Sequence, residues 1–173
     1  IIVPSGSCAG MMGHDYLQLF EGSPEFDKVQ RFAARVYDLS QYLDEILQVN
    51  YEDKGEKIKV AWHSNCHALR VAKSVEASKN LIRKFANVEL LELEHEEECC
   101  GFGGTFAVKE SDISNAMALA KIEDIKKTGA SYLISGDGGC LLNISGTMKR
   151  NGVDIKCLHL YDFLIKRLEG APL

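Results

Sequence analysis

Apolar residues recur along this chain with two different spacings, one typical of strands and one typical of helices. Short, continuous apolar segments bounded by polar residues, glycine or proline predict strands. We place these strands at residues 1–3, 58–63, 88–93, 131–135 and 155–160. Segments with apolar residues three and four positions apart predict helices. We place these helices at residues 16–20, 24–49, 66–85, 111–128 and 162–168, with a further helix from about residue 140.

Local signals support several of these ends. Ser23 and Pro24 are a strong helix start, because serine caps a helix and proline suits its first position. Gly129 is expected to end the helix that begins near Ser111. We interpret residues 5–10, which are rich in serine and glycine, as a loop.

Strands that alternate with helices predict an α/β fold, with a mainly parallel sheet flanked by helices. Sites in such sheets form at the carboxyl ends of the strands. Five cysteines follow predicted strands, namely Cys8, Cys66, Cys99, Cys100 and Cys140. We therefore expect their sulfur atoms to gather at one edge of the sheet, with a separate centre for Cys8 left open. Cys157 lies inside a strand and is expected to pack in the core.

Composition narrows the class of protein. The 173 residues are 46% apolar and 26% charged, which is typical of globular proteins. A net charge of −5, with both signs interspersed, gives no electrostatic footprint for nucleic acid. No apolar run is long enough to span a bilayer, and peripheral association stays open. Six cysteines are too few for a disulfide framework, so we expect a cytoplasmic protein that uses its thiols for metal or redox chemistry.

The adjacent cysteines of the segment Glu98–Gly104 carry the strongest chemical signal. Neighbouring side chains of a strand point to opposite faces, so an adjacent pair is poorly suited to packing. Flexible glycines follow Cys99 and Cys100 at once. This context indicates that both sulfur atoms face one centre, either a metal cluster or a disulfide. Cys66 and Cys140 are expected at helix amino termini, where the free N–H groups and the dipole favour a thiolate.

Two segments of the chain are similar to each other. Residues 2–8 and 133–140 both contain a strand, a turn of small residues, a cysteine and the start of a helix. The chain begins without Met, inside a predicted strand, and we expect a preceding segment with its own Cys-Cys-Gly element. The similarity is short, so a chance origin stays open.

The order of cysteine, long gap, Cys-Cys-Gly, long gap and cysteine resembles the CCG cysteine-rich domain. This domain occurs in heterodisulfide reductase, in the iron–sulfur subunits of glycolate oxidase and anaerobic glycerol-3-phosphate dehydrogenase, and in lactate utilization protein A. The segments Pro4–Met11, Cys99–Phe106 and Gly139–Ile144 look most similar to the last family. That family usually has two modules. The resemblance implies that residues 1–50 are the tail of a first CCG module plus a connecting helix, and that residues 51–173 are a complete second module.

The resemblance also implies a cofactor. Cys66, Cys99, Cys100 and Cys140 would hold an iron–sulfur cluster of the [4Fe-4S] type, which aerobic preparation can remove. Cys8, the last cysteine of the first module, counts as a further cofactor-binding residue. Heterodisulfide reductase modules end in Cys-x-x-Cys, whereas Asn143 stands at the second cysteine position here. This difference argues against the non-cubane cluster of that enzyme.

The resemblance implies an iron–sulfur electron-transfer subunit in a complex that oxidises L-lactate or glycolate. Other subunits of that complex would be its partners. The chain would be a subunit of an oxidoreductase and not a complete enzyme by itself, because no residue pattern in it suits the abstraction of a proton and a hydride from the substrate.

Two alternatives stay open. Cys99 and Cys100 can form the dithiol of a thiol–disulfide redox enzyme. Alternatively, His63, Cys66 and His67 can combine with the adjacent cysteines in a structural zinc module. Otherwise, both histidines are expected to be polar loop residues or hydrogen-bond donors beside a metal ligand.

We expect Asp137 to be a helix cap or turn residue. Residues 96–98 are expected to form a solvated acidic loop.

Overall fold

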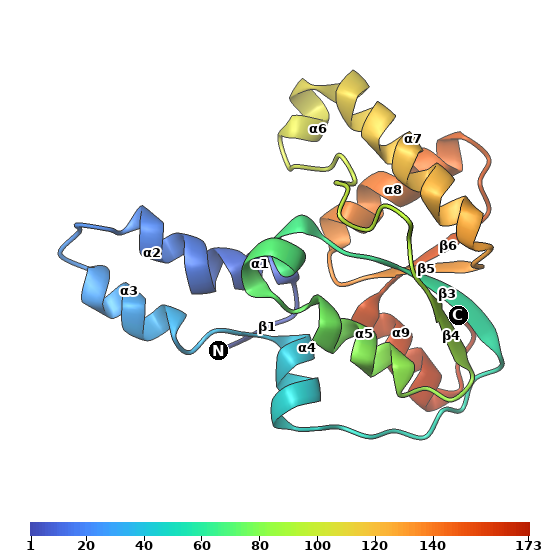
Figure 1. The fold of residues 1–173 in the computed structure, drawn as a ribbon, viewed down its shortest axis with the longest axis horizontal. Helices are drawn as coiled ribbons and strands as arrows, with labels where there is room; N and C mark the ends of the chain where they lie inside the picture. The colour runs from blue at the N-terminus through green and yellow to red at the C-terminus, as the bar shows by residue number, and fades with distance from the viewer.

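The computed structural model describes residues 1–173 and contains two parallel sheets (Figure 1). The larger sheet has four strands in the order β4-β3-β5-β6, all parallel. Its strands are β3 (Ile58–His63), β4 (Val88–Leu91), β5 (Tyr132–Ser135) and β6 (Lys156–His159). The predicted α/β fold with a mainly parallel sheet is confirmed, and the strands lie where the sequence predicted them.

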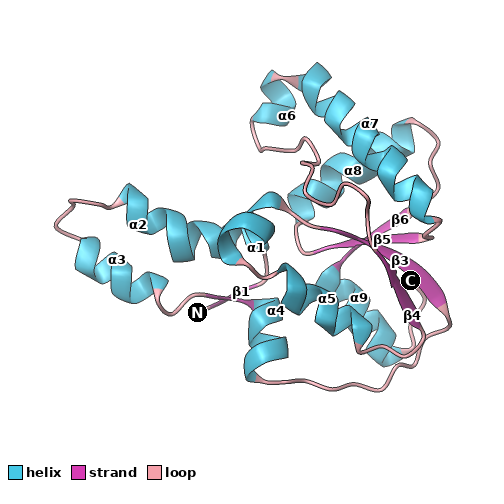
Figure 2. Ribbon diagram, viewed as in Figure 1, coloured by secondary structure: helices cyan, strands magenta, loops and turns pink.

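Helices cover both faces of the larger sheet (Figure 2). The helices α5 (Val75–Arg83) and α9 (Leu160–Glu169) lie on one face, and α7 (Ser111–Thr128) and α8 (Gly138–Arg150) lie on the other. Alternate residues of β3 point to opposite faces. Val60 and Trp62 therefore belong to the core under α5 and α9, whereas Ala61 belongs to the core under α7 and α8. Burial on both faces explains why three consecutive residues of β3, Val60 to Trp62, are apolar.

The predicted helix ends on this sheet are largely confirmed. Gly129 follows α7 with a φ of +70°, the left-handed conformation that ends helices. Asp137 caps α8 with its side chain. The predicted helix at residues 66–85 is interrupted, because Lys73 has a φ of +56° between η3 (Ala68–Ala72, a π-helical turn) and α5. A short helix that the sequence did not predict, α6 (Phe106–Lys109), lies before α7.

The prediction of a loop at residues 5–10 is wrong. Helix α1 (Gly6–Gly10) begins directly after β1 (Ile2–Val3) and continues through η1 (Met11–Asp15) into α2 (Tyr16–Leu19). Glycine has low helix propensity, but here it allows close packing. A Cβ on Gly6 would lie only 2.6 Å from the Cβ of Ala68 in η3. Tertiary packing therefore decides the structure of this segment.

The prediction of one helix over residues 24–49 is also wrong. Helix α3 (Phe26–Ala33) ends early, and β2 (Tyr37–Asp38) pairs in parallel with β1 to form the smaller sheet. The chain then forms α4 (Leu39–Gln41) and η2 (Tyr42–Ile46). The Asp38 carboxylate accepts a hydrogen bond from the Ser40 N–H at 2.8 Å, so Asp38 is the N-cap of α4. None of the helices has the length and apolar content needed to cross a bilayer.

Candidate metal centre

Five of the six cysteines line one cavity of about 470 Å³. They are Cys8, Cys66, Cys99, Cys100 and Cys140. The cavity lies beyond the carboxyl ends of β3 and β5, where Asn65, Phe102, Asp137 and several glycines complete its wall. The structure thus brings together sulfur atoms from four separate stretches of the chain, and Cys8 shares the cavity with the others.

Two side-chain caps hold Cys66 and Cys140 at helix starts. The Asn65 Oδ1 atom accepts a hydrogen bond from the Ala68 N–H at 2.8 Å, at the beginning of the helical turn that contains Cys66. The Asp137 Oδ1 atom accepts from the N–H groups of Gly139 at 3.0 Å and Cys140 at 3.2 Å. Both cysteines therefore sit at the positive end of a helix, where negative charge on sulfur is favoured.

Asp137 also joins two cysteine-bearing turns. Its Oδ2 atom accepts a hydrogen bond from the Ser7 hydroxyl at 2.5 Å, and a longer one from the Ser5 hydroxyl at 3.4 Å. Ser7 directly precedes Cys8. The prediction of a cap role for Asp137 is confirmed, and one carboxylate fixes the position of Cys8 relative to Cys140.

The adjacent cysteines lie on a loop that only glycine permits. Gly101 has a φ of +82°, and a Cβ there would lie 2.5 Å from the Ser114 carbonyl oxygen. The Gly101 N–H donates a hydrogen bond to the Cys99 sulfur at 3.4 Å, which shows that glycine N–H groups of this loop reach sulfur. The Asn143 side chain donates to the Cys100 carbonyl at 2.9 Å. Asn143 thus anchors the cysteine pair to α8.

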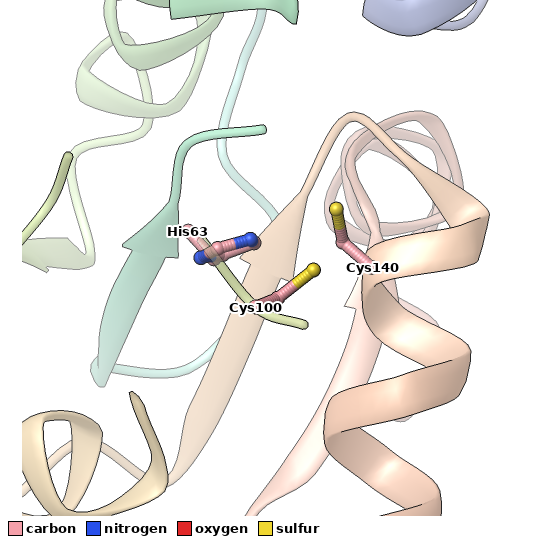
Figure 3. A group of neighbouring side chains, drawn as sticks. All are labelled: His63, Cys100 and Cys140. Carbon is pink, nitrogen blue, oxygen red and sulfur yellow. The ribbon is translucent and has the colours of Figure 1, made fainter. Parts of the chain in front are cut away.

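The five cavity cysteines and the neighbouring His63 form an inner and an outer set of side chains. Cys100 and Cys140 are buried, as is His63 at the end of β3 (Figure 3). The ligand atoms of these three residues all lie within 4.8 Å of one another. Cys8 and Cys66 are exposed, and Cys99 is half-buried. We call the first group the inner triad and the second group the outer thiols.

Burial and neighbouring groups keep Cys100 and His63 uncharged without a metal. A hydrogen bond to Cys140, together with burial, raises the pKa of Cys100 to about 12, although a hydrogen bond from Cys99 acts in the opposite direction. The hydrogen bond to Cys100 and burial also raise the pKa of Cys99. Burial, assisted by the positive charge of Lys121, lowers the pKa of His63 to about 3. A bound metal would reverse this for the thiols, because coordination deprotonates them.

Both positively and negatively charged residues surround Cys99 and Cys100. Lys121 and Arg70 are close enough to act on the charges of Cys100 and Cys99, respectively. The prediction of a solvated acidic loop holds for Glu97 and Glu98, which are exposed, but it is wrong for Glu96. Glu96 accepts hydrogen bonds from the Ser64 hydroxyl at 2.5 Å and from the Lys79 ammonium at 2.8 Å. Its carboxylate therefore fixes the end of β3 to α5.

The other residues considered from the sequence lie outside the cavity. The His67 ring contacts the Asp15 carboxylate at 3.1 Å and does not join the inner triad, contrary to the zinc alternative. Cys157 packs beside Met148, with 3.8 Å between their sulfur atoms, and burial raises its pKa to about 11. The predicted core role of Cys157 is confirmed.

Sequence reasoning left two features of this site open. It allowed a separate centre for Cys8, and it combined His63 with the adjacent cysteines only in the zinc alternative, together with Cys66 and His67. The sequence signals for His63 are its position at the last residue of a strand and the cysteine three residues after it. The soft sulfur atoms and one imidazole are ligands that suit an iron–sulfur cluster or zinc, and backbone N–H groups such as that of Gly101 can donate hydrogen bonds to the sulfur atoms.

Comparison with known proteins gives consistent results. The family described as the CCG cysteine-rich domain matches residues 60–145, a range that contains His63 and four of the five cavity cysteines. Over 172 residues the chain is 37% identical to lactate utilization protein A of Oceanobacillus iheyensis, covering 99% of this chain and 70% of that protein.

Two further relatives carry related names. Lactate utilization protein A of Shouchella clausii is 41% identical over 167 residues, which are 95% of this chain and 69% of that protein. Lactate utilization protein A 2 of Bacillus cereus is 40% identical over 169 residues, which are 97% of this chain and 70% of that protein. The chain therefore belongs to the lactate utilization protein A family, and it contains the cysteine-rich CCG domain of that family.

Proposed function

We propose that this chain is an iron–sulfur electron-transfer subunit of a system that oxidises L-lactate or a similar 2-hydroxy acid such as glycolate. The observation that carries the proposal is the convergence of five cysteines on one cavity. Cys66, Cys99, Cys100 and Cys140 would hold a cluster of the [4Fe-4S] type, and Cys8 would lie at its outer side. The names of the relatives support the link to lactate utilization.

The residues that line the cavity are better suited to binding a cluster than to oxidising a 2-hydroxy acid. A bound cluster would supply reversible one-electron transfer. Helix starts at Cys66 and Cys140 stabilise thiolate charge, and glycine N–H groups can donate to sulfur and adjust the potential. The only carboxylate in the wall, Asp137, is used by its four hydrogen bonds. We therefore assign substrate oxidation to partner subunits, which pass electrons to this chain.

The domain arrangement is part of the same proposal. The pair β1–β2 is similar to the pair β5–β6, since each consists of two parallel strands with a cysteine-bearing helix directly after the first, although η1, α2 and α3 also lie between β1 and β2. We infer that residues 1–50 are the tail of a first CCG module with a connecting segment, and that residues 51–173 are the second module. The six free cysteines favour a cytoplasmic location.

Anaerobic purification tests the proposal directly. We expect the protein to contain iron and acid-labile sulfide, and to give an electron paramagnetic resonance signal after reduction or oxidation. Cys99→Ser and Cys140→Ser should lose most of the iron. Cys157→Ser is the matched control, because Cys157 packs in the core away from the cavity, and it should retain the iron.

Two outcomes would contradict the proposal. Full iron content in both Cys99→Ser and Cys140→Ser would exclude the proposed ligands. Zinc without iron or sulfide in the wild-type protein would support a structural zinc module instead. The dithiol alternative has less support, because the raised pKa values of Cys99 and Cys100 disfavour a reactive thiolate.

A further inference from the structure

His63 is buried in a way that requires explanation. It is only 1% exposed, and neither of its ring nitrogens has a hydrogen-bond partner. A buried polar atom without a partner carries a desolvation cost, and such atoms in native proteins usually contact a water molecule or an ion. Because His63 is the last residue of β3, a central strand of the sheet, its ring cannot turn to solvent without disturbing that strand.

The nearest candidate partners of the ring are sulfur atoms. A nitrogen of His63 and the sulfur atoms of Cys100 and Cys140 lie within 4.8 Å of one another, although no hydrogen bond joins the ring to either sulfur (Figure 3). In a tetrahedral site with metal–sulfur bonds of about 2.3 Å and metal–nitrogen bonds of about 2.0 Å, two such ligand atoms lie about 3.5 Å apart. A small contraction of the inner triad would therefore give the spacing of ligands around one ion.

We propose that the inner triad binds a divalent transition-metal ion through one nitrogen of His63 and the thiolates of Cys100 and Cys140. This ion occupies protein that carries no cluster, because the same two thiolates cannot hold both centres at once. The inference rests on the proposed function only in placing a metal in this cavity. Zinc, cobalt and ferrous ions accept this donor set. The outer thiols Cys66 and Cys99 line the same cavity and can supply the remaining ligand.

The second ring nitrogen of His63 also has a candidate partner. Metal-binding histidines usually donate their other N–H to an oxygen atom that fixes the ring. Ser135 is the register partner of His63 in the β3–β5 pair, so both side chains lie on the same face of the sheet. The hydroxyl of Ser135 is buried and also has no partner. It can accept this hydrogen bond when the first nitrogen binds the metal.

Cobalt binding to the reduced, metal-free full chain under anaerobic conditions tests the inference. Wild-type protein should bind Co²⁺ with sulfur-to-cobalt charge-transfer absorption and with the d–d bands of a tetrahedral site. His63→Gln should weaken Co²⁺ binding at least about 10-fold and change the d–d bands, since even partners of ligands contribute that much. His67→Gln is the matched control, because His67 contacts Asp15 outside the triad, and it should match wild type.

A ligand replacement protects the test against a folding defect. His63→Cys places a third thiolate in the triad and should bind Co²⁺ more tightly than His63→Gln, with a stronger charge-transfer band. Circular dichroism establishes which variants fold. Wild-type affinity and d–d bands in folded His63→Gln would overturn the inference. Folded His63→Cys that binds Co²⁺ no more tightly than folded His63→Gln would also overturn it.

Iron loading separates this inference from the proposed function. If wild-type protein holds iron and sulfide while folded His63→Gln keeps wild-type cobalt spectra, only the role of His63 fails. If cobalt binding depends on His63 but the wild-type protein takes up no iron and sulfide, only the electron-transfer function fails.

Discussion

The turn before Cys8 and the turn before Cys140 are built from similar sequences but differ in their surroundings. Both follow a strand that pairs in parallel with the next strand, and both lead into a helix. Cys140 follows a central strand of four and is buried, whereas Cys8 follows a strand of the two-stranded sheet and is exposed. Asp137 caps its helix, whereas Ser5 makes no side-chain cap. The same local sequence pattern thus forms a similar turn in both places, and the size of the sheet that carries the turn determines how deeply the cysteine sulfur is buried.

The largest expected difference between the two turns concerns metal retention. Cys140→Ser should lower iron per chain by about tenfold or more, because the buried sulfur belongs to the proposed ligand set. Cys8→Ser should retain most of the iron, since the exposed sulfur lies at the outer side of the cavity. Iron and sulfide assays on anaerobically purified protein measure both. Equal loss in the two variants would remove the distinction between the turns.

The shared carboxylate gives the next largest effect. Asp137→Ala should lower the free energy of unfolding by about 2 to 3 kcal/mol, because it removes the cap of α8 and the acceptor of the Ser7 hydroxyl. Asp137→Asn retains a capping oxygen and should cost less. Urea unfolding of the metal-free protein measures both. A loss below about 0.5 kcal/mol in Asp137→Ala would show that the two turns are held independently.

Close packing distinguishes two adjacent glycines at the start of α8. A Cβ on Gly139 would overlap the Phe102 ring, whereas a Cβ on Gly138 would meet nothing within 4 Å. Gly139→Ala should cost about 1 to 3 kcal/mol and displace the loop that contains Cys99 and Cys100. Gly138→Ala is the control and should leave stability and iron content nearly unchanged. Equal unfolding free energies for these two variants would contradict the packing argument.

The smallest expected effect concerns the contact between the amino-terminal region and α5. Asp44 in η2 accepts hydrogen bonds from the Lys84 ammonium at 2.6 Å and from the Asn80 amide at 3.1 Å. Burial raises the pKa of Asp44, but these hydrogen bonds outweigh it, so the pKa lies below its usual value. Its contribution to stability is therefore complete above the unfolded pKa of about 4, and it is lost as pH falls through the lower folded pKa.

Asp44→Asn should accordingly cost about 0.5 to 1 kcal/mol at pH 7. The difference from wild type should shrink as the pH falls below about 4, because protonated Asp44 is also uncharged. Urea unfolding at a series of pH values measures this. A difference that is constant from pH 7 to pH 3 would show that the charge of Asp44 is not responsible.

The sequence predicted the parts of the fold that local patterns determine. The strands of the larger sheet are short, mostly apolar segments, and Gly129 marks a helix end through its own backbone conformation. The prediction failed at residues 34–38, where helical spacing of apolar residues continues in the sequence. There the pairing of β2 with β1, which is distant in sequence, replaces the helix.

The same distinction applies to the site. The sequence predicted that cysteines after several strands would share one edge, because parallel strands bring their carboxyl ends together. It did not reveal the depth of each side chain. His63 joins the inner triad because α7, α8 and the cysteine loop cover the end of β3, and that covering depends on contacts across the whole chain.

The hydrogen bonds of Asp137 have a consequence for the motions of the protein. Because one carboxylate holds the amides of Gly139 and Cys140 and also the Ser7 hydroxyl, neither turn can open without releasing a partner of the other. The Ala9 N–H donates a hydrogen bond to the Ser5 carbonyl. A change that alters the amide hydrogen exchange rate of Cys140 should therefore alter that of Ala9 in the same direction. The amino-terminal helices and the larger sheet would then fluctuate as a single cooperative unit at this junction, in addition to being joined by the packing of α1 on η3 and of α4 and η2 on α5.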